Sequence, residues 1–86
     1  MGSYSLRFKR SAEKELRKIS SPDAGRIVQR IRNLSREPRP SGVQMLKEQG
    51  RYLRIRQGDY RIVYEIDDAC QEVTIIKIGH RWEVYD

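Results

Sequence analysis

The chain has 86 residues, a length that favours a single domain over residues 1–86 with a modest hydrophobic core. Its formal net charge of +6 favours an acidic partner, either nucleic acid or an acidic protein. The single cysteine excludes an internal disulfide and fits a reducing compartment, so we expect a cytoplasmic protein. The sequence has no apolar run long enough to span a membrane, no metal-ligand spacing and no glycine-rich phosphate loop. We therefore expect neither a cofactor nor a metal.

The first half of the chain predicts one strand and two helices. Apolar and polar residues alternate over residues 4–8, which indicates a short strand. Helical spacing follows over about 11–19, with Ser11 as the expected N-cap, and a second helix is expected to begin with Pro22 at its first position. We interpret the polar face of the second helix as solvated; it carries Arg26, Arg30, Arg32 and Arg36.

The second half predicts a sheet. Residues 43–46 form a brief extended piece, and strands are expected over about 51–57 and 60–66. A turn at 67–71 leads to a run over 73–78 that is apolar on both parities, as in a central strand. The predicted fold class is α+β, with two N-terminal helices packed on one face of a small, mainly antiparallel sheet. The predicted order is strand, helix, helix and three strands.

Gly58-Asp59 is typical of a two-residue hairpin turn, and this turn determines how the flanking strands pair. It places Arg56 opposite Arg61 and Arg54 opposite Val63. Directly opposed residues share a face of the sheet, as do residues two apart along a strand. The three arginines should therefore gather on one face, with apolar side chains on the other: Leu53, Ile55, Ile62 and Tyr64. Because like charges side by side repel, the cluster indicates a bound anion, and phosphate is the first choice.

Cationic chemistry on phosphate is what this composition supports. RNA supplies its own nucleophile, the 2′-hydroxyl, so an enzyme can cleave it without a metal by aligning the reacting groups and neutralising the developing charge. Guanidinium groups match phosphate oxygens, and tyrosine can stack on a base or move a proton. We expect His80, Arg81 and Tyr85, which follow the last strand, to extend the basic face.

The segments LRIRQGDYRIVYEI and IIKIGHRWEVY together resemble the RelE/ParE superfamily of toxins, and specifically its RelE branch. FKRSAEKELRKIS is similar to the first helix of that family. The resemblance implies a toxin of a type II toxin–antitoxin system, a ribosome-dependent mRNA endonuclease that cleaves A-site codons by metal-free 2′-hydroxyl attack. By motif, it implies catalytic roles for Arg54, Arg56, Arg61, Arg81 and Tyr85.

The resemblance also bears on proton transfer and on partners. The best-known RelE pattern has lysines on the first basic strand, and a lysine can serve as a general base where arginine cannot. His80 is then a candidate for proton transfer; the alternative is that it packs or orients Arg81. The implied partners are a cognate antitoxin that wraps the toxin, the ribosomal A site with its mRNA and rRNA, and operator DNA through the antitoxin. A toxin–antitoxin heterotetramer without membrane contact is expected.

Two other functions remain open at this point. A ParE-like toxin that poisons DNA gyrase by protein binding would share the fold. An inactive or regulatory module would also fit arginines in the place of lysines.

Overall fold

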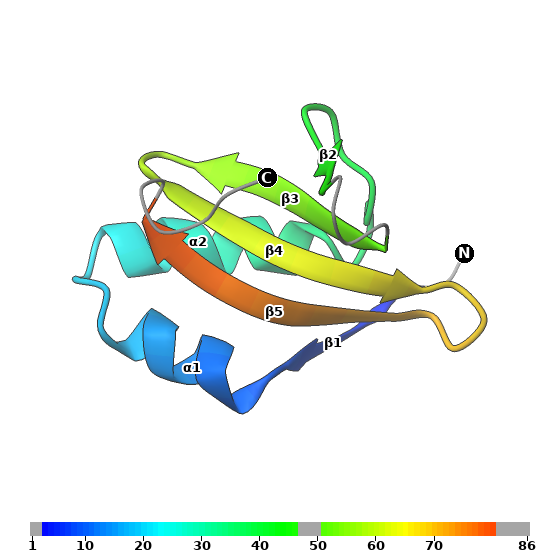
Figure 1. Cartoon of the computed structure of the whole chain (residues 1–86), viewed down its shortest axis with the longest axis horizontal. Helices are drawn as coiled ribbons and strands as arrows, with labels where there is room; N and C mark the ends of the chain where they lie inside the picture. The colour runs from blue at the N-terminus through cyan, green and yellow to red at the C-terminus, as the bar shows by residue number, and fades with distance from the viewer. Residues whose placement is uncertain (1–2, 47–50, 81–86) are drawn as a thin grey trace.

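The computed structural model describes residues 3–46 and 51–80 (Figure 1). Its elements, in chain order, are β1 (Ser5–Phe8), α1 (Arg10–Arg17), α2 (Asp23–Asn33), β2 (Gln44–Met45), β3 (Tyr52–Gln57), β4 (Tyr60–Asp67) and β5 (Glu72–His80). They form one five-stranded sheet in the order β1-β5-β4-β3-β2. Only β1 runs parallel to its neighbour, so the predicted α+β class with a mainly antiparallel sheet is confirmed.

The helix starts differ from the predicted ones. Lys9, rather than Ser11, is the N-cap of α1, and no side chain caps either helix. The Lys9 N–H donates to Ile75 O at 2.9 Å, and Glu13 N–H donates to Lys9 O at 3.1 Å. The chain therefore passes from its last bond with β5 directly into the helix. Pro22 lies at the N-cap of α2 and not at its first helical position.

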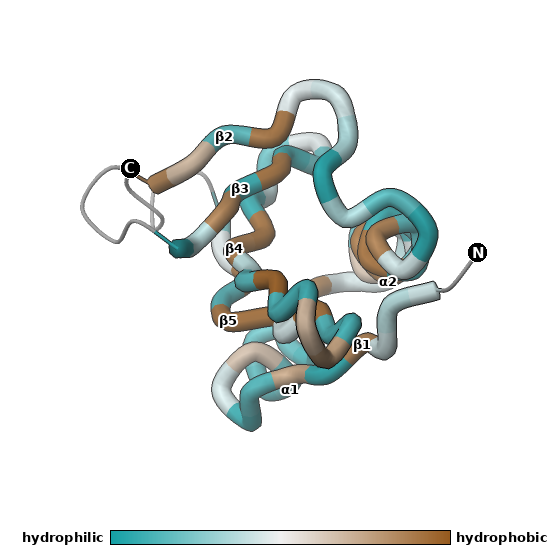
Figure 2. Tube along the Cα trace, turned by 90° about the vertical axis from the view of Figure 1, so that its right-hand side faces the viewer, coloured by the Kyte–Doolittle hydropathy of each residue, from teal (hydrophilic) through white to brown (hydrophobic). Residues whose placement is uncertain are grey.

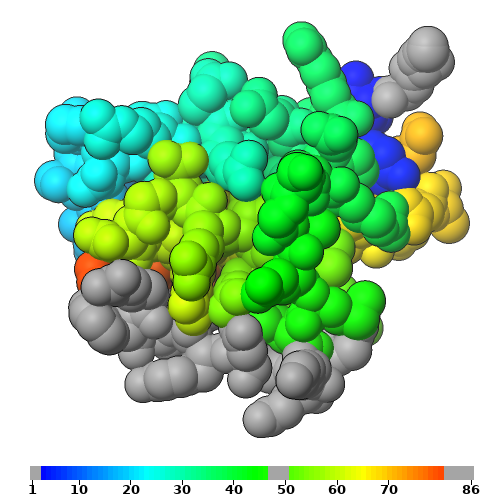
Figure 3. All heavy atoms as spheres, turned by 90° about the horizontal axis from the view of Figure 1, so that it is seen from above, coloured from blue at the N-terminus to red at the C-terminus, as the bar shows by residue number. Residues whose placement is uncertain are grey.

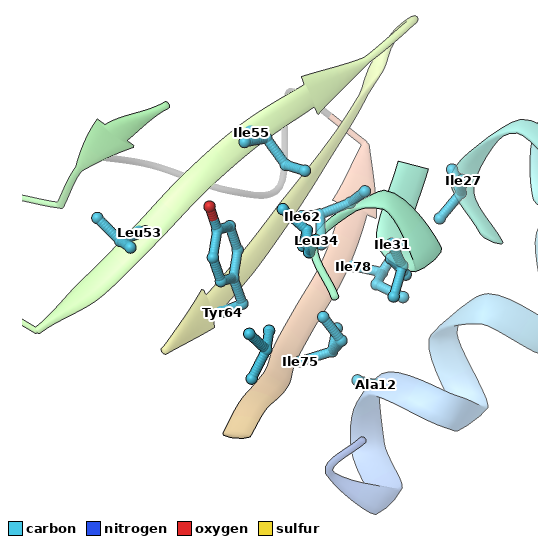
Figure 4. Close-up of a cluster of buried hydrophobic side chains, with 11 residues drawn as sticks. Ala12, Ile27, Ile31, Leu34, Leu53, Ile55, Ile62, Tyr64, Ile75 and Ile78 are labelled. Atoms are coloured by element: carbon cyan, nitrogen blue, oxygen red, sulfur yellow. The ribbon is translucent and has the colours of Figure 1, made fainter. Parts of the chain in front are cut away.

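Both helices pack on the same face of the sheet. Figures 1 and 2 show α2 along one side of the sheet, with α1 next to β5 and β1. Figure 4 shows sheet side chains such as Ile55 and Ile62 pointing towards Ile31 of α2 and Leu34, the residue that follows the helix. All four belong to one buried cluster that Ala12 of α1 completes. Hydrophobic burial on this side is the main force that holds the layers together.

A β-bulge allows β5 to serve this core over its whole length. Val73, Ile75 and Ile78 all belong to the main buried cluster, although Ile75 and Ile78 are three residues apart. A regular strand would place those two on opposite faces. The pairing of β4 with β5 shifts by one residue between Val63 and Tyr64, which leaves Ile76 as the extra residue. Side chains beyond the bulge therefore exchange faces.

Glu15 of α1 makes hydrogen bonds to the edge of β5 where β1 does not pair with it. β1 pairs only with residues 72–75 of β5. Farther along, the Ile78 N–H donates to Glu15 Oε1 at 2.9 Å, and Lys77 Nζ donates to Glu15 Oε2 at 2.9 Å. A helix side chain thus takes the place of a neighbouring strand at this edge, which satisfies one backbone donor and protects the edge from pairing with another chain.

Tyr64 links the core to the loop after α2. Its side chain is buried, and its hydroxyl donates to Pro38 O at 2.6 Å. Burial raises the pKa of Tyr64 to about 12, whereas a tyrosine in an unfolded chain titrates near ~10. The unfolded state therefore releases this proton first. Stability from this group is complete below about pH 10 and is lost as pH rises towards about 12, by roughly 2–3 kcal/mol in all.

We expect Tyr64→Phe to make the free energy of unfolding less dependent on pH in the alkaline range. At pH 7 the variant should be less stable by about 1 kcal/mol, because one hydrogen bond is lost. Between about pH 10 and 12 its free energy of unfolding should decline less steeply than that of the wild type. Urea unfolding of both proteins at several pH values measures this difference. Parallel declines would show that Tyr64 does not titrate differently in the two states.

Candidate functional site

The hairpin between β3 and β4 has the predicted turn and register. Gly58 has a φ of 60°, a left-handed conformation that glycine adopts without strain. Arg56 pairs with Arg61 and Arg54 pairs with Val63, as the sequence predicts. Figure 4 shows the apolar residues Ile55 and Ile62 on the side of the helices. Because side chains alternate along a strand, the three arginines lie on the other face of the sheet. We call this surface the arginine face.

The three arginines of this face differ in exposure. Arg54 is only 5% exposed and donates a hydrogen bond to Gln44 Oε1, across from it on β2. Arg61 is half-buried and lies between Arg56 on one neighbouring strand and Gly79 on the other. Arg56 is exposed. Gly79 is buried and adds no side chain next to Arg61, so the neighbouring guanidinium group on this side of the hairpin is that of Arg56.

A small apolar cluster interrupts the arginine face. Val63 and Leu46 are buried there, with Tyr52 and Ile76 packed against them. The prediction that one face is apolar and the other cationic is therefore too simple. Ile76 of β5 joins this cluster because it follows Ile75, which faces the main core, and successive side chains of a strand point to opposite faces. Apolar contacts beneath long arginine side chains limit their freedom and hold them in place.

His80 does not lie on the arginine face, so the expectation that it extends this face is wrong. It pairs with Tyr60, and their rings are in edge contact with centroids 5.5 Å apart. Both line a pocket of about 320 Å³ beside α1, together with Glu15 and Lys18. The physical reason is the bulge at Ile76, which reverses the facing of β5 from Lys77 onwards, so that Gly79 and not His80 lies on the side of Arg61. A role for His80 in proton transfer remains a prediction, and this position does not favour it.

Other predicted site residues lie outside the described part of the chain, namely Arg81 and Tyr85. Sequence reasoning missed two residues that the fold brings to Arg54 and Arg56. These are Arg30 of α2 and Gln44 of β2, which line a common pocket with them. The sequence contained one indication for Arg30: it is adjacent to Ile31, a residue of the apolar face of the helix, so its side chain begins near the border of the buried face.

Metal-binding side chains, membrane-spanning helices and a reactive cysteine were also considered for the described residues. Within residues 3–46 and 51–80, no three side chains of the metal-ligating types lie together, and no helix is long and apolar enough to cross a membrane. Cys70 is exposed, and a hydrogen bond to Asp67 raises the pKa of its thiol, as expected from its acidic neighbours. A high thiol pKa opposes a nucleophilic role.

Comparison with known proteins defines the class. A family model described as the ParE toxin of the type II toxin–antitoxin system matches residues 6–85, so the chain belongs to this family of toxins. Toxin RelG of Mycobacterium tuberculosis is 32% identical over 83 residues, which cover 95% of each chain. The resemblance to the RelE/ParE superfamily predicted from the sequence motifs is confirmed.

Solved structures agree with this assignment. The toxin–antitoxin complex RelBE of Mycobacterium tuberculosis contains a chain with a TM-score of 0.82 and 31% identity; the match covers 92% of this chain and 99% of that one. The isolated RelE toxin of Escherichia coli has a TM-score of 0.79 and 26% identity, with coverage of 91% and 84%. The protein is thus a type II toxin with a RelE-like fold.

Proposed function

We propose that this toxin is a ribosome-dependent mRNA endonuclease that cleaves codons in the ribosomal A site without a metal. The observation that carries the proposal is the pairing of Arg56 with Arg61, with Arg54 two residues along the same strand and face. Three guanidinium groups on one face suit a phosphate whose negative charge grows during reaction. Arg81 and Tyr85 are proposed members of the same site, from the family motif.

The reaction needs only groups that RNA and these side chains supply. The 2′-oxygen attacks the adjacent phosphorus, a 2′-O–P bond forms, and the P–O5′ bond breaks. The products are a 2′,3′-cyclic phosphate and a 5′-hydroxyl, and the proton of the 2′-hydroxyl ends on the leaving oxygen. Arginine remains protonated and acts through charge and hydrogen bonds. Tyr85 is the proposed group for stacking or proton transfer.

An antitoxin is the proposed inhibitor. One similar structure is a RelBE toxin–antitoxin complex, and the intact Escherichia coli RelBE complex is another, with a TM-score of 0.80 and 26% identity. A net charge of +6 favours an acidic or amphipathic antitoxin segment that covers the arginine face. We further propose a heterotetrameric complex in the cytoplasm that binds operator DNA through the antitoxin.

A gyrase-poisoning toxin is the second candidate, because the matching family model carries the ParE description. The arginine face supports RNA as the target, since an inhibitor that works by protein binding does not require clustered phosphate ligands. The two candidates predict different damage in a cell that expresses the toxin. One produces cut messenger RNA, and the other produces cleaved DNA bound to gyrase.

Mapping of mRNA 5′ ends on translating ribosomes tests the proposal. We expect new 5′-hydroxyl ends inside codons after brief expression of the wild-type chain. The control is Arg17→Ala, an exposed arginine of α1, which should give the same ends. Growth arrest without new ends within codons would refute the endonuclease, and accumulation of gyrase-bound DNA breaks would establish the second candidate.

A further inference from the structure

A pocket at the edge of β3 combines Arg54 and Arg56 with residues to which the family motif assigns no role. Its volume is about 330 Å³, and its lining residues are Arg30, Gly42, Gln44, Arg54 and Arg56. We call it the edge pocket. In Figure 3, α2 (cyan to teal), the β2 segment (green) and the β3–β4 hairpin (yellow-green) meet in this part of the surface.

The pocket exists because the β2–β3 ladder ends early. Gln44 pairs with Arg54 and Met45 pairs with Leu53, and no earlier residue of this segment pairs with β3. Continuation of the same register would place Gly42 opposite Arg56. Gly42 instead has a φ of 86°, and the chain turns away towards α2. The edge of β3 beyond Arg54 is therefore open, with Arg56 at one wall of the opening.

The lining of the edge pocket is cationic. It contains three arginines and no carboxylate. Within the described part of the chain, neither Arg30 nor Arg56 forms an ion pair with a carboxylate. Arg30 Nε is also buried and has no hydrogen-bond acceptor there. Buried donors in native proteins almost always have a partner, which can be a protein group, an ordered water or a bound ion, so Arg30 Nε is available to an anion in the edge pocket.

Arg30 differs from the other arginines of α2. Arg26 is exposed and forms an ion pair with Asp23 at 3.5 Å, and Arg32 is exposed. Arg30 is half-buried and lines the edge pocket together with residues of β2 and β3. The interpretation of this helix face as solvated therefore holds for Arg26 and Arg32 and is wrong for Arg30.

We propose that the edge pocket binds a phosphate group of the RNA strand next to the one that is cleaved, with Arg30 as a binding residue. The inference rests on the proposed function, because RNA is the ligand. Arg56 lines the edge pocket and also lies opposite Arg61, so one strand of RNA can contact both places. Guanidinium forks favour phosphate over a single carboxylate, since phosphate offers oxygens in several directions.

Binding of an uncleavable strand tests the edge pocket without the ribosome. The probe is a fluorescent 2′-O-methyl RNA oligonucleotide, which lacks the attacking hydroxyl. We expect Arg30→Gln to weaken binding roughly tenfold and to reduce the slope of log K against log salt by about 0.7, the value for one phosphate contact on a single strand. Arg32→Gln, which removes the same charge from the same helix, should change both far less.

Further arms separate the alternatives. Arg30→Lys keeps the charge and should recover part of the affinity, and thermal unfolding confirms that each variant is folded. Equal effects of Arg30→Gln and Arg32→Gln, or no binding by the wild type, would overturn the edge pocket as an RNA site. Loss of affinity for a polyglutamate peptide but not for RNA would assign the pocket to an acidic protein and overturn the proposal. Cleavage on ribosomes is scored separately, so failure of the proposed endonuclease activity stays distinguishable from failure of this site.

Discussion

Replacement of Arg61 by alanine should reduce mRNA cleavage on ribosomes about 10²- to 10³-fold, the scale of losing one preorganised donor to a transition state. Arg61 lies opposite Arg56 and beside Gly79, on the face away from the main core. Loss of its guanidinium should therefore affect the reacting phosphate more than packing. The measurement is the single-turnover rate of 5′-end formation on programmed ribosomes with saturating toxin.

The same variant needs a stability measurement, because Arg61 is half-buried. We expect its free energy of unfolding to change by less than about 1 kcal/mol, as for most substitutions outside the core. Arg17→Ala, which removes an exposed charge from α1, controls for the net charge of the toxin. A loss of more than about 2 kcal/mol in Arg61→Ala would show that this arginine supports the fold instead.

Ile75→Ala should cause the largest loss in free energy of unfolding, and the adjacent Ile76 offers a direct comparison. Ile75 is fully buried in the main cluster, whereas Ile76 is only partly buried and packs on the other face beside Val63. Ile75→Ala should cost about 3–5 kcal/mol, because it removes apolar contacts and leaves a cavity that the sheet and helices cannot close. Such a loss is a large part of the total stability of a small domain.

Ile76→Ala is the matched control, and we expect it to cost less than half as much. Chemical unfolding of both variants gives the comparison directly. The two substitutions delete the same atoms from neighbouring positions, so the difference between them reports only their surroundings. Equal losses would contradict the placement of Ile75 in the main core and of Ile76 in the smaller cluster on the other face.

The hairpin was predictable because its signals are local. A two-residue turn allows one pairing of the flanking strands, and that pairing places Arg54, Arg56 and Arg61 on a common face without knowledge of the rest of the chain. The helices were equally visible from their apolar spacing. The start of the first helix was predicted at Ser11, but the helix is capped by Lys9 without a side-chain hydrogen bond. Lys9 is held by its N–H bond to Ile75 O of β5, a contact between residues far apart in the sequence.

Amino-acid order by itself determined the α+β class, the hairpin register and the shared face of three arginines, because each depends on residues near one another in the chain. Tertiary structure alone decided the side on which His80 lies and the approach of Arg30 to the hairpin. The bulge in β5 arises where Ile75 and Ile78 must both reach one core, and this requirement comes from packing against the helices. Arg30 and Arg56 are far apart in sequence, and only the end of the β2–β3 ladder leaves a space that both can line.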